Sequence, residues 1–229
     1  MSEIAGNLSV VRDRVAEAAR RSLRNSGEIE LLVVSKTWPA EIVAEAVAAG
    51  QLLFGENKVQ EAEAKVPRLP EDLVWHLVGP LQRNKVRKAL GLFQVLHGVS
   101  SLKLARAIDR VAGEEGVVPG IYLQVNVGRE ESKSGFLPDE MEPLLEEIIS
   151  LERLKVLGLM AIPPREPDAE GSRRWFVRLR ELRDRLETAG GVALPGLSMG
   201  MSGDYEVAIE EGATIVRVGS AIFGTRNSK

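Results

Sequence analysis

The stretch Leu31-Leu32-Val33-Val34-Ser35-Lys36 places four apolar residues directly before a serine and a lysine. A short apolar run of this kind is typical of a buried strand. A lysine at the end of such a strand lies at the rim of whatever the strand helps to build, and its amine can serve there as a nucleophile. The alternative is a structural lysine whose charged end extends into solvent. The rest of the chain bears on this choice.

Strand-like and helix-like segments alternate on both sides of this stretch. Apolar residues at helical spacing predict a leading helix over residues 8–23, which Gly27 ends. The other expected helices cover residues 39–49, 58–65, 82–90, 102–115, 139–150, 172–189 and 204–211. After the run at 31–34, strands are expected over residues 52–54, 73–78, 93–96, 120–127, 154–162, 197–199 and 214–218, of which 197–199 is weak.

This alternation predicts parallel βαβ units. The eight expected strands are separated by helical segments and preceded by a leading helix. This pattern favours a single (β/α)8 TIM barrel with an extra N-terminal helix. An open doubly wound sheet is the alternative, but no dinucleotide-binding glycine fingerprint opens the chain. No linker, low-complexity run or charge block divides residues 1–229, so we expect one domain.

Composition restricts the classes of partner. The 229 residues carry 30 basic and 33 acidic side chains, and the net charge of −3 gives no electrostatic footprint for nucleic acid or an anionic membrane. The chain has no cysteine, which excludes disulfides and thiolate chemistry and agrees with a cytoplasmic protein. Residues 1–6 show no signal-peptide pattern, and no apolar run approaches the roughly 20 residues that span a membrane. We expect a monomer, because no uniformly apolar surface stripe is evident.

Polar and small residues gather at the predicted strand ends, which in a barrel meet at one rim. Residues 198–204 (SMGMSGD) lead from the seventh strand into a helix, and residues 218–220 (VGS) form a second small-residue turn after the eighth. Backbone N–H groups in such turns can bind phosphate, and barrels frequently use these two loops for it. The alternative is a tight turn followed by a capped helix. The presence of both turns favours phosphate.

Arg217 lies between two valines of the last strand, so alternation places it on the face opposite both. An arginine inside a barrel needs an anion or an acceptor, whereas an outward one would pair with a carboxylate on a covering helix. A reactive Lys36, a phosphate cradle and an inward Arg217 together suggest pyridoxal 5′-phosphate, whose aldehyde would form a Schiff base with the lysine. The two histidines, His76 and His97, form no metal-binding pattern, and we expect His76 to be a buried supporting residue.

Six motifs carry a resemblance that covers nearly the whole chain. They are residues 34–37 (VSKT), 54–61 (FGENKVQE), 76–85 (HLVGPLQRNK), 132–135 (SKSG), 197–204 (LSMGMSGD) and 217–224 (RVGSAIFG). In this order they resemble the YggS/PROSC family of pyridoxal phosphate homeostasis proteins. The resemblance implies a barrel like the N-terminal domain of alanine racemase. The chain departs from the family pattern at Trp38, where many relatives have a second lysine.

The resemblance also implies roles for individual residues. Lys36 would hold the cofactor as an aldimine, and Arg217 would face the pyridine nitrogen. Asn57 and Met199 would line the site. The residues expected to hold the phosphate are Ser202, Gly203, Gly219 and Ser220.

Two functions are compatible with such a site. The first is a non-catalytic carrier that buffers pyridoxal phosphate or delivers it, with cofactor-dependent apoenzymes as transient partners. The second is a small amino-acid racemase, which needs an acid/base group opposite the lysine. Alanine racemases take that group from a tyrosine of a second domain, for which no room is expected before Lys229. Tyr122 is expected away from the rim and Tyr205 on a helix surface, so we favour the carrier. A cofactor-free barrel that binds RNA or a partner would leave the inward Arg217 and the paired turns unexplained.

Overall fold

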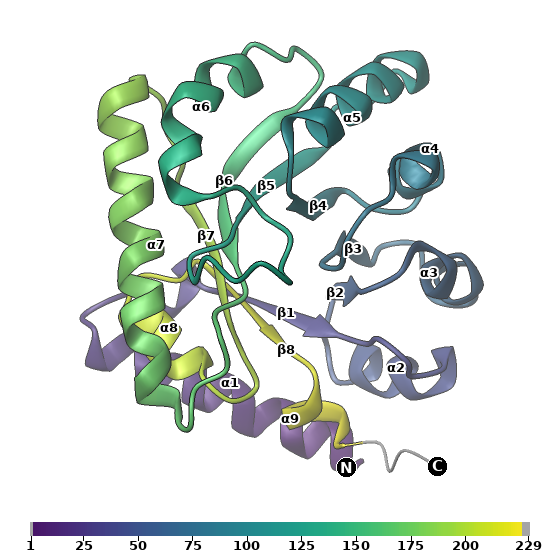
Figure 1. The fold of residues 1–229 in the computed structure, drawn as a ribbon. Coiled ribbons are helices and arrows are strands. Elements are labelled where there is room, and N and C mark those ends of the chain that lie inside the picture. Colours follow the sequence, from purple (N-terminus) through teal and green to yellow (C-terminus); the bar gives the residue numbers. More distant parts are fainter. Residues whose placement is uncertain (1, 226–229) are drawn as a thin grey trace.

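The strands of this protein close into a barrel in which they pair in chain order and β8 returns to pair with β1 (Figure 1). The computed structural model describes residues 2–225, so the ends of the expected domain, residues 1 and 226–229, lie outside the described part. All strand pairs are parallel, which confirms the predicted (β/α)8 barrel over the open sheet. The strands are β1 (Glu30–Val34), β2 (Leu53–Glu56), β3 (Val74–Leu77), β4 (Val95–Val99), β5 (Gly120–Val125), β6 (Lys155–Ala161), β7 (Gly196–Met201) and β8 (Ile215–Val218).

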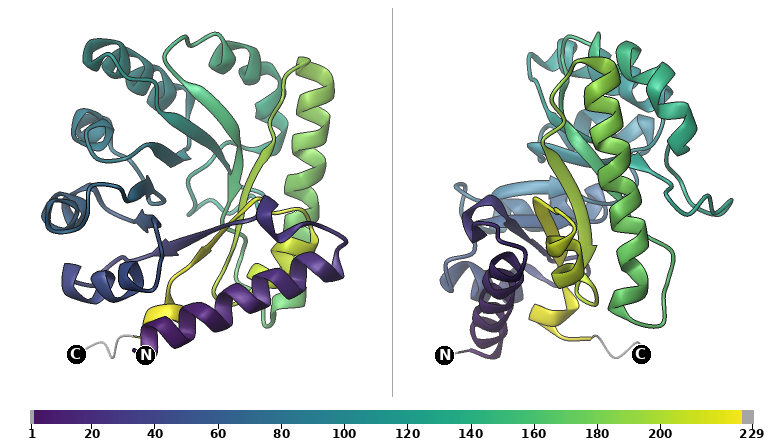
Figure 2. Two further views of the ribbon diagram at one scale, coloured as in Figure 1. Left: turned by 180° about the vertical axis from the view of Figure 1, so that it is seen from behind. Right: turned by 90° about the vertical axis from the view of Figure 1, so that its left-hand side faces the viewer.

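Helices cover the outside of the barrel, and Figure 2 shows α1 crossing beside the C-terminal elements. The side-chain amide of Asn7 on α1 donates to the carbonyl of Ile222 at 3.0 Å, which ties the leading helix to the end of the described chain. Among residues 2–225, none of the helices has the length and apolar character that crossing a bilayer requires. The helices are α1 (Glu3–Arg21), α2 (Ala40–Ala48), α3 (Val59–Lys65), α4 (Val86–Leu90), α5 (Leu102–Glu115), α6 (Met141–Ile149), α7 (Ala169–Gly190), α8 (Tyr205–Glu210) and α9 (Ser220–Phe223).

Several helices begin or end at residues that cap them. Helix α5 has the bounds expected from the sequence, since the Ser101 hydroxyl accepts from the amide of Leu104 at its start and Gly116 ends it in a left-handed conformation. Helix α1 begins five residues earlier than expected because Ser2 caps it. The expected helix over 82–90 instead begins with a tight turn over Arg83–Lys85 before α4.

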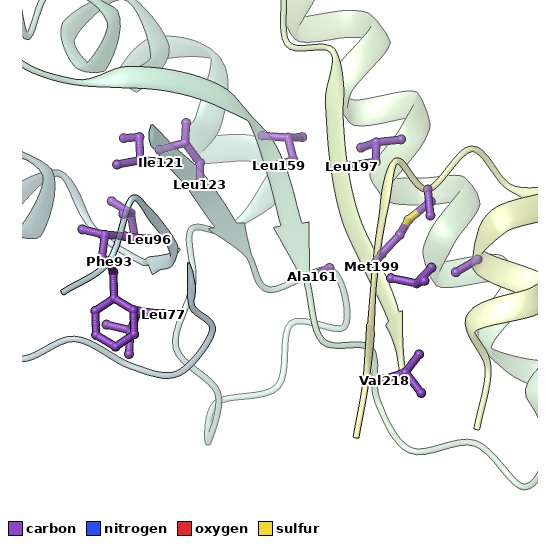
Figure 3. Packing of buried hydrophobic residues seen from close by; sticks show 14 of the residues in the cluster. Leu77, Phe93, Leu96, Ile121, Leu123, Leu159, Ala161, Leu197, Met199 and Val218 are labelled. Atoms are coloured by element: carbon purple, nitrogen blue, oxygen red, sulfur yellow. The ribbon is translucent and has the colours of Figure 1, made fainter. Parts of the chain in front are cut away.

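Alternation along the strands divides the apolar side chains between the two faces of the barrel wall. Leu32, Val34, Tyr122, Met160 and Ile215 belong to a cluster inside the barrel. A larger cluster lies between the strands and the helices (Figure 3). Because the interior is packed with side chains, a ligand of the barrel is expected at its carboxyl-terminal mouth.

Candidate functional site

Lys36 lies in the turn that follows β1 and its side chain is exposed. No hydrogen bond or ion pair joins it to another residue within 2–225. Strand β1 pairs with β2 through Val34↔Gly55 and with β8 through Val33↔Val218. Continued by one residue, the β1–β8 register brings Gly219 beside Val34, in agreement with the close approach of these two residues. The expected position of Lys36, at the end of its strand on the rim of the barrel, is therefore confirmed.

The turns after β7 and β8 are joined by one hydroxyl group. The Oγ atom of Ser202 accepts from the backbone N–H of Gly219 at 3.2 Å and of Ala221 at 3.3 Å. With both lone pairs used, the hydroxyl hydrogen of Ser202 is left to donate. The backbone N–H groups of Gly203 and Ser220 have no acceptor within residues 2–225. The four residues proposed for the phosphate thus lie together, and three of them, Ser202, Gly203 and Ser220, present unused hydrogen-bond donors, which is the chemistry an anion requires.

Gly219 is required at its position by the closeness of the two chain segments. A Cβ atom there would lie 2.9 Å from the carbonyl oxygen of Val34, closer than real Cβ contacts. The glycine therefore allows the turn after β8 to approach the end of β1. Gly79 has a similar role at β3, where a Cβ atom would lie 2.1 Å from the carbonyl oxygen of Asn57.

Arg217 points into the barrel and is buried, with 5% of its surface exposed. Its Nη1 donates to the carbonyl oxygen of Ser198 at 2.7 Å and to the Ser198 hydroxyl at 2.8 Å, and its Nη2 donates to the carbonyl oxygen of Ala161 at 2.9 Å. These acceptors are all neutral. Nε and the second hydrogen of Nη2 have no acceptor within residues 2–225, so a buried cation retains two unused donors.

A chain of side chains continues from Arg217 across the barrel. His97 Nδ1 lies 2.8 Å from Ser198 Oγ, and His97 Nε2 lies 3.0 Å from His76 Nδ1. The Ser198 hydroxyl accepts from Arg217 and shares a hydrogen bond with His97 Nδ1, and His97 Nε2 shares one with His76 Nδ1. A hydrogen on both Nε2 atoms satisfies these two contacts, and so does a hydrogen on both Nδ1 atoms.

The charge states within this chain follow from burial. Burial lowers the pKa of Arg217 to about 10, so the guanidinium remains cationic at neutral pH. Burial lowers the pKa of His76 to about 4, and burial together with the nearby His76 and Arg217 lowers the pKa of His97 well below its ordinary value. Both imidazoles are therefore neutral at neutral pH. The expectation that His76 is a buried supporting residue is confirmed.

Because His76 is buried in its neutral form, we expect the protein to lose stability in mild acid. The unfolded chain binds a proton at His76 as the pH falls through about 6.5, whereas the folded protein binds it only near pH 4. Protons therefore favour the unfolded chain, and the stability present above pH 6.5 is lost between pH 6.5 and 4. We expect His76 to account for about 3 kcal/mol of that loss, measured by urea unfolding at pH 7 and pH 4.5.

The matched variant for this measurement is His76→Gln, whose amide can still form a hydrogen bond with His97 as donor or acceptor but does not titrate. Carboxylates also titrate in this range, but they are common to both proteins. The variant should therefore lose less stability on acidification than the native protein. An equal pH dependence in the two would show that His76 is protonated in the folded state.

The side chains of Met199 and Tyr205 lie elsewhere than the sequence indicated, whereas Tyr122 lies away from the rim as expected. Met199 is fully buried in the cluster between β7 and the helices, so only its backbone faces the other predicted residues (Figure 3). Tyr205 was expected on a helix surface, and this is wrong because its ring is 3% exposed and packs in the same cluster. Tyr122 is buried inside the barrel, stacked on His97 with ring centroids 4.6 Å apart. Burial raises its pKa to about 12, so it is a poor acid or base.

A buried ion pair lies behind the strand end that carries Lys36. Glu56 is fully buried, and its Oε1 accepts from the Ser35 hydroxyl at 2.6 Å and from the Lys65 ammonium. Lys65 also donates to the carbonyl oxygen of Ser35 at 2.8 Å. Burial raises the pKa of Glu56, while the bonds from Lys65 and Ser35 lower it.

Sequence reasoning missed Lys65 as part of this region, and it gave no individual role to His97 or Ser198. His97 and Ser198 have a signal in strand alternation, since both occupy inward positions near the carboxyl ends of β4 and β7. Lys65 has no such signal, because its partners lie nine and thirty residues away along the chain.

The chain is similar in sequence and in structure to several known proteins. The family described as alanine racemase, N-terminal domain, matches residues 7–227. A protein of Aquifex aeolicus named pyridoxal phosphate homeostasis protein is 45% identical over 220 residues, 96% of each chain. A protein of the same name from Pseudomonas aeruginosa is 46% identical over 231 residues, covering 99% of this chain and 97% of the relative. The structure of PipY from Synechococcus elongatus with PLP bound is similar with a TM-score of 0.85 and 39% identity, over 96% of this chain and 100% of PipY.

Proposed function

Because this chain belongs to the family of the pyridoxal phosphate homeostasis proteins, which has the alanine racemase N-terminal barrel, we propose that it binds pyridoxal 5′-phosphate, buffers it and delivers it to other proteins. We further propose that residues 1–229 act as one domain and as a monomer. The cysteine-free composition suits a cytoplasmic location, where thiols are kept reduced.

The observation that most strongly supports this proposal is the buried, charged side chain of Arg217 and its unused hydrogen-bond donors. A buried guanidinium with two unused donors and only neutral acceptors matches the nitrogen of a pyridine ring, which can accept but brings no charge. Because Arg217 remains cationic, it would keep that nitrogen unprotonated. A pyridine ring whose nitrogen is unprotonated is a weak electron sink. This property favours storage of the cofactor rather than catalysis on amino acids.

The other residues fit the remaining parts of the same ligand. Gly203, Ser220 and the Ser202 hydroxyl would hold the phosphate through the donors described above. Asn57 would contact the ring edge. When bound, the cofactor would supply an aldehyde that can condense with the amine of Lys36 with loss of one water.

The positions of the tyrosines favour a carrier over a racemase. The chain contains two tyrosines. Tyr122 lies inside the barrel and Tyr205 lies between barrel and helices, and both are almost fully buried. Neither can act as a second acid/base group at the mouth. We therefore propose that the protein holds its cofactor without robust turnover and releases it to cofactor-dependent apoenzymes.

The test is the visible absorbance spectrum of the purified protein mixed with pyridoxal phosphate. We expect a Schiff-base band, and borohydride should trap the cofactor on one peptide that contains Lys36. The loaded protein is then given to an apo-aminotransferase, either mixed with it or separated from it by a dialysis membrane. Restored aminotransferase activity, with no conversion of L-alanine to its D-isomer by the loaded protein, supports the carrier. The absence of a band, or steady racemisation, overturns it.

A further inference from the structure

Both peptide groups that flank Lys36 are held by charged side chains of α3. The backbone N–H of Thr37 donates to Oε2 of Glu61 at 2.7 Å. On the other side of Lys36, the carbonyl oxygen of Ser35 accepts from Nζ of Lys65 at 2.8 Å. Glu61 and Lys65 are four residues apart, which places them one above the other on the same face of the helix. They also line one surface hollow together with Thr37.

The backbone of this turn is held in a conformation it would not adopt by itself. Thr37 has a φ of 67°, in the left-handed region. A β-branched residue rarely occupies that region, because its branched side chain crowds the backbone there. Such a conformation persists where the surroundings over-determine it. The turn is closed by its own hydrogen bond from the backbone N–H of Trp38 to the carbonyl oxygen of Ser35 at 3.1 Å, and the contact from the Thr37 amide to Glu61 adds a second constraint from α3.

Ser35 is held even more completely than Thr37. Its backbone N–H donates to the carbonyl oxygen of Gly55 at 3.0 Å, and its hydroxyl donates to the buried carboxylate of Glu56. Its carbonyl is the one that Lys65 binds. The side chain of Lys36, by contrast, has no partner within residues 2–225. A lysine with a fixed backbone and an unoccupied amine is suited to meet a ligand that arrives from solution.

We propose that Glu61 and Lys65 are positioning residues, which hold the main chain on both sides of Lys36 so that its amine is directed toward the cofactor aldehyde. This inference rests on the proposed function, since it concerns how the same lysine is presented. Around Lys36, Glu61 and Lys65 contact main-chain atoms of the neighbouring residues, so they act through Lys36. Pre-ordering of this kind raises affinity by reducing the entropy lost when the bond forms.

The variant that tests the proposal is Glu61→Ala, which removes the acceptor of the Thr37 amide from a partly exposed site. Its matched control is Glu63→Ala on the same helix. Both changes remove one glutamate and one surface ion pair, because Glu61 lies 3.7 Å from Lys58 and Glu63 lies 2.8 Å from Lys88. Glu63 has no recorded contact with residues 35–37. The two variants should therefore melt at similar temperatures.

Two ligands distinguish an effect on the position of the Lys36 amine from an effect on the rest of the binding site. Pyridoxal phosphate can bond to Lys36, whereas pyridoxine phosphate has an alcohol in place of the aldehyde and cannot. We expect Glu61→Ala to weaken pyridoxal phosphate about tenfold, through lost pre-ordering, and to leave pyridoxine phosphate unchanged. Glu63→Ala should change neither. The conservative variant Glu61→Gln keeps an acceptor oxygen and should recover most of the affinity.

A third measurement needs no cofactor. In the free protein, the amide hydrogen of Thr37 should exchange with solvent faster in Glu61→Ala than in the native chain, by about tenfold or more. If Glu61→Ala and Glu63→Ala give the same exchange and the same affinities, the proposal is wrong. If the native protein forms no Schiff-base band at all, the proposed function fails, while the exchange result still reports on the contact between Glu61 and Thr37.

Discussion

The Lys36→Ala variant is expected to form no Schiff-base band with pyridoxal phosphate and no adduct that borohydride can trap. Lys36 is exposed at the rim and has no bond to other described residues, so its removal leaves the fold intact. The covalent bond benefits from a reactive amine that the protein already holds in place. We therefore expect the dissociation constant to rise by at least about 100-fold, which corresponds to about 2.7 kcal/mol.

The control for this prediction is Lys103→Ala, which removes another exposed lysine, on α5. It should retain the band. Pyridoxine phosphate should bind native protein and Lys36→Ala alike, because Arg217 and the turn that contains Ser202 are unchanged. An adduct of undiminished strength on a different lysine would contradict the assignment of Lys36.

The second prediction concerns stability, and its largest effect is expected at Lys65. The side chains of Lys65 and Glu56 are 6% and 0% exposed, and Oε2 of Glu56 has no hydrogen-bond partner. In Lys65→Met the carboxylate stays buried with only the Ser35 hydroxyl to stabilise it. Breaking a buried pair in this way costs about 3–5 kcal/mol. The melting temperature should fall by roughly 6–20 °C for a chain of this length.

Two comparisons show whether the unpaired charge is the cause. The double variant Glu56→Gln with Lys65→Met removes both charges and should regain much of the lost stability, since a neutral pair has a smaller desolvation cost. Lys88→Met breaks an ion pair whose side chains are 64% and 37% exposed, and it should cost less than about 1 kcal/mol. Equal losses in Lys65→Met and Lys88→Met would mean that Glu56 is not ionised when folded.

Much of the fold could be predicted because its signals are local. The apolar run before Lys36, the helical spacing in α5 and the glycines that end helices each depend on neighbours a few residues apart. The weak strand at 197–199 was predicted too short, because β7 extends from Gly196 to Met201. Its glycines and serines have low strand propensity, and pairing with both β6 and β8 overrides it.

The candidate site could be predicted only in part. Alternation in β8 correctly placed Arg217 inside the barrel, and the two small-residue turns do lie together. The same alternation places the Met199 side chain outside, although the family motif associates it with the site. Tyr205 was assigned to a surface because a helix of six residues has too few turns to define a buried face.

By itself, the sequence determined the order of elements, the barrel, and the gathering of Lys36, Ser202 and Arg217 at one rim. These properties follow from side-chain period and from the rule that parallel strand ends meet at one edge. Only the tertiary structure decided that Arg217 is joined to His76 through partners as far as 101 residues apart in the chain, and that α3 holds the backbone around Lys36. Hydrogen bonds depend on distances between atoms to within a few tenths of an ångström, and no periodic pattern in the sequence encodes them.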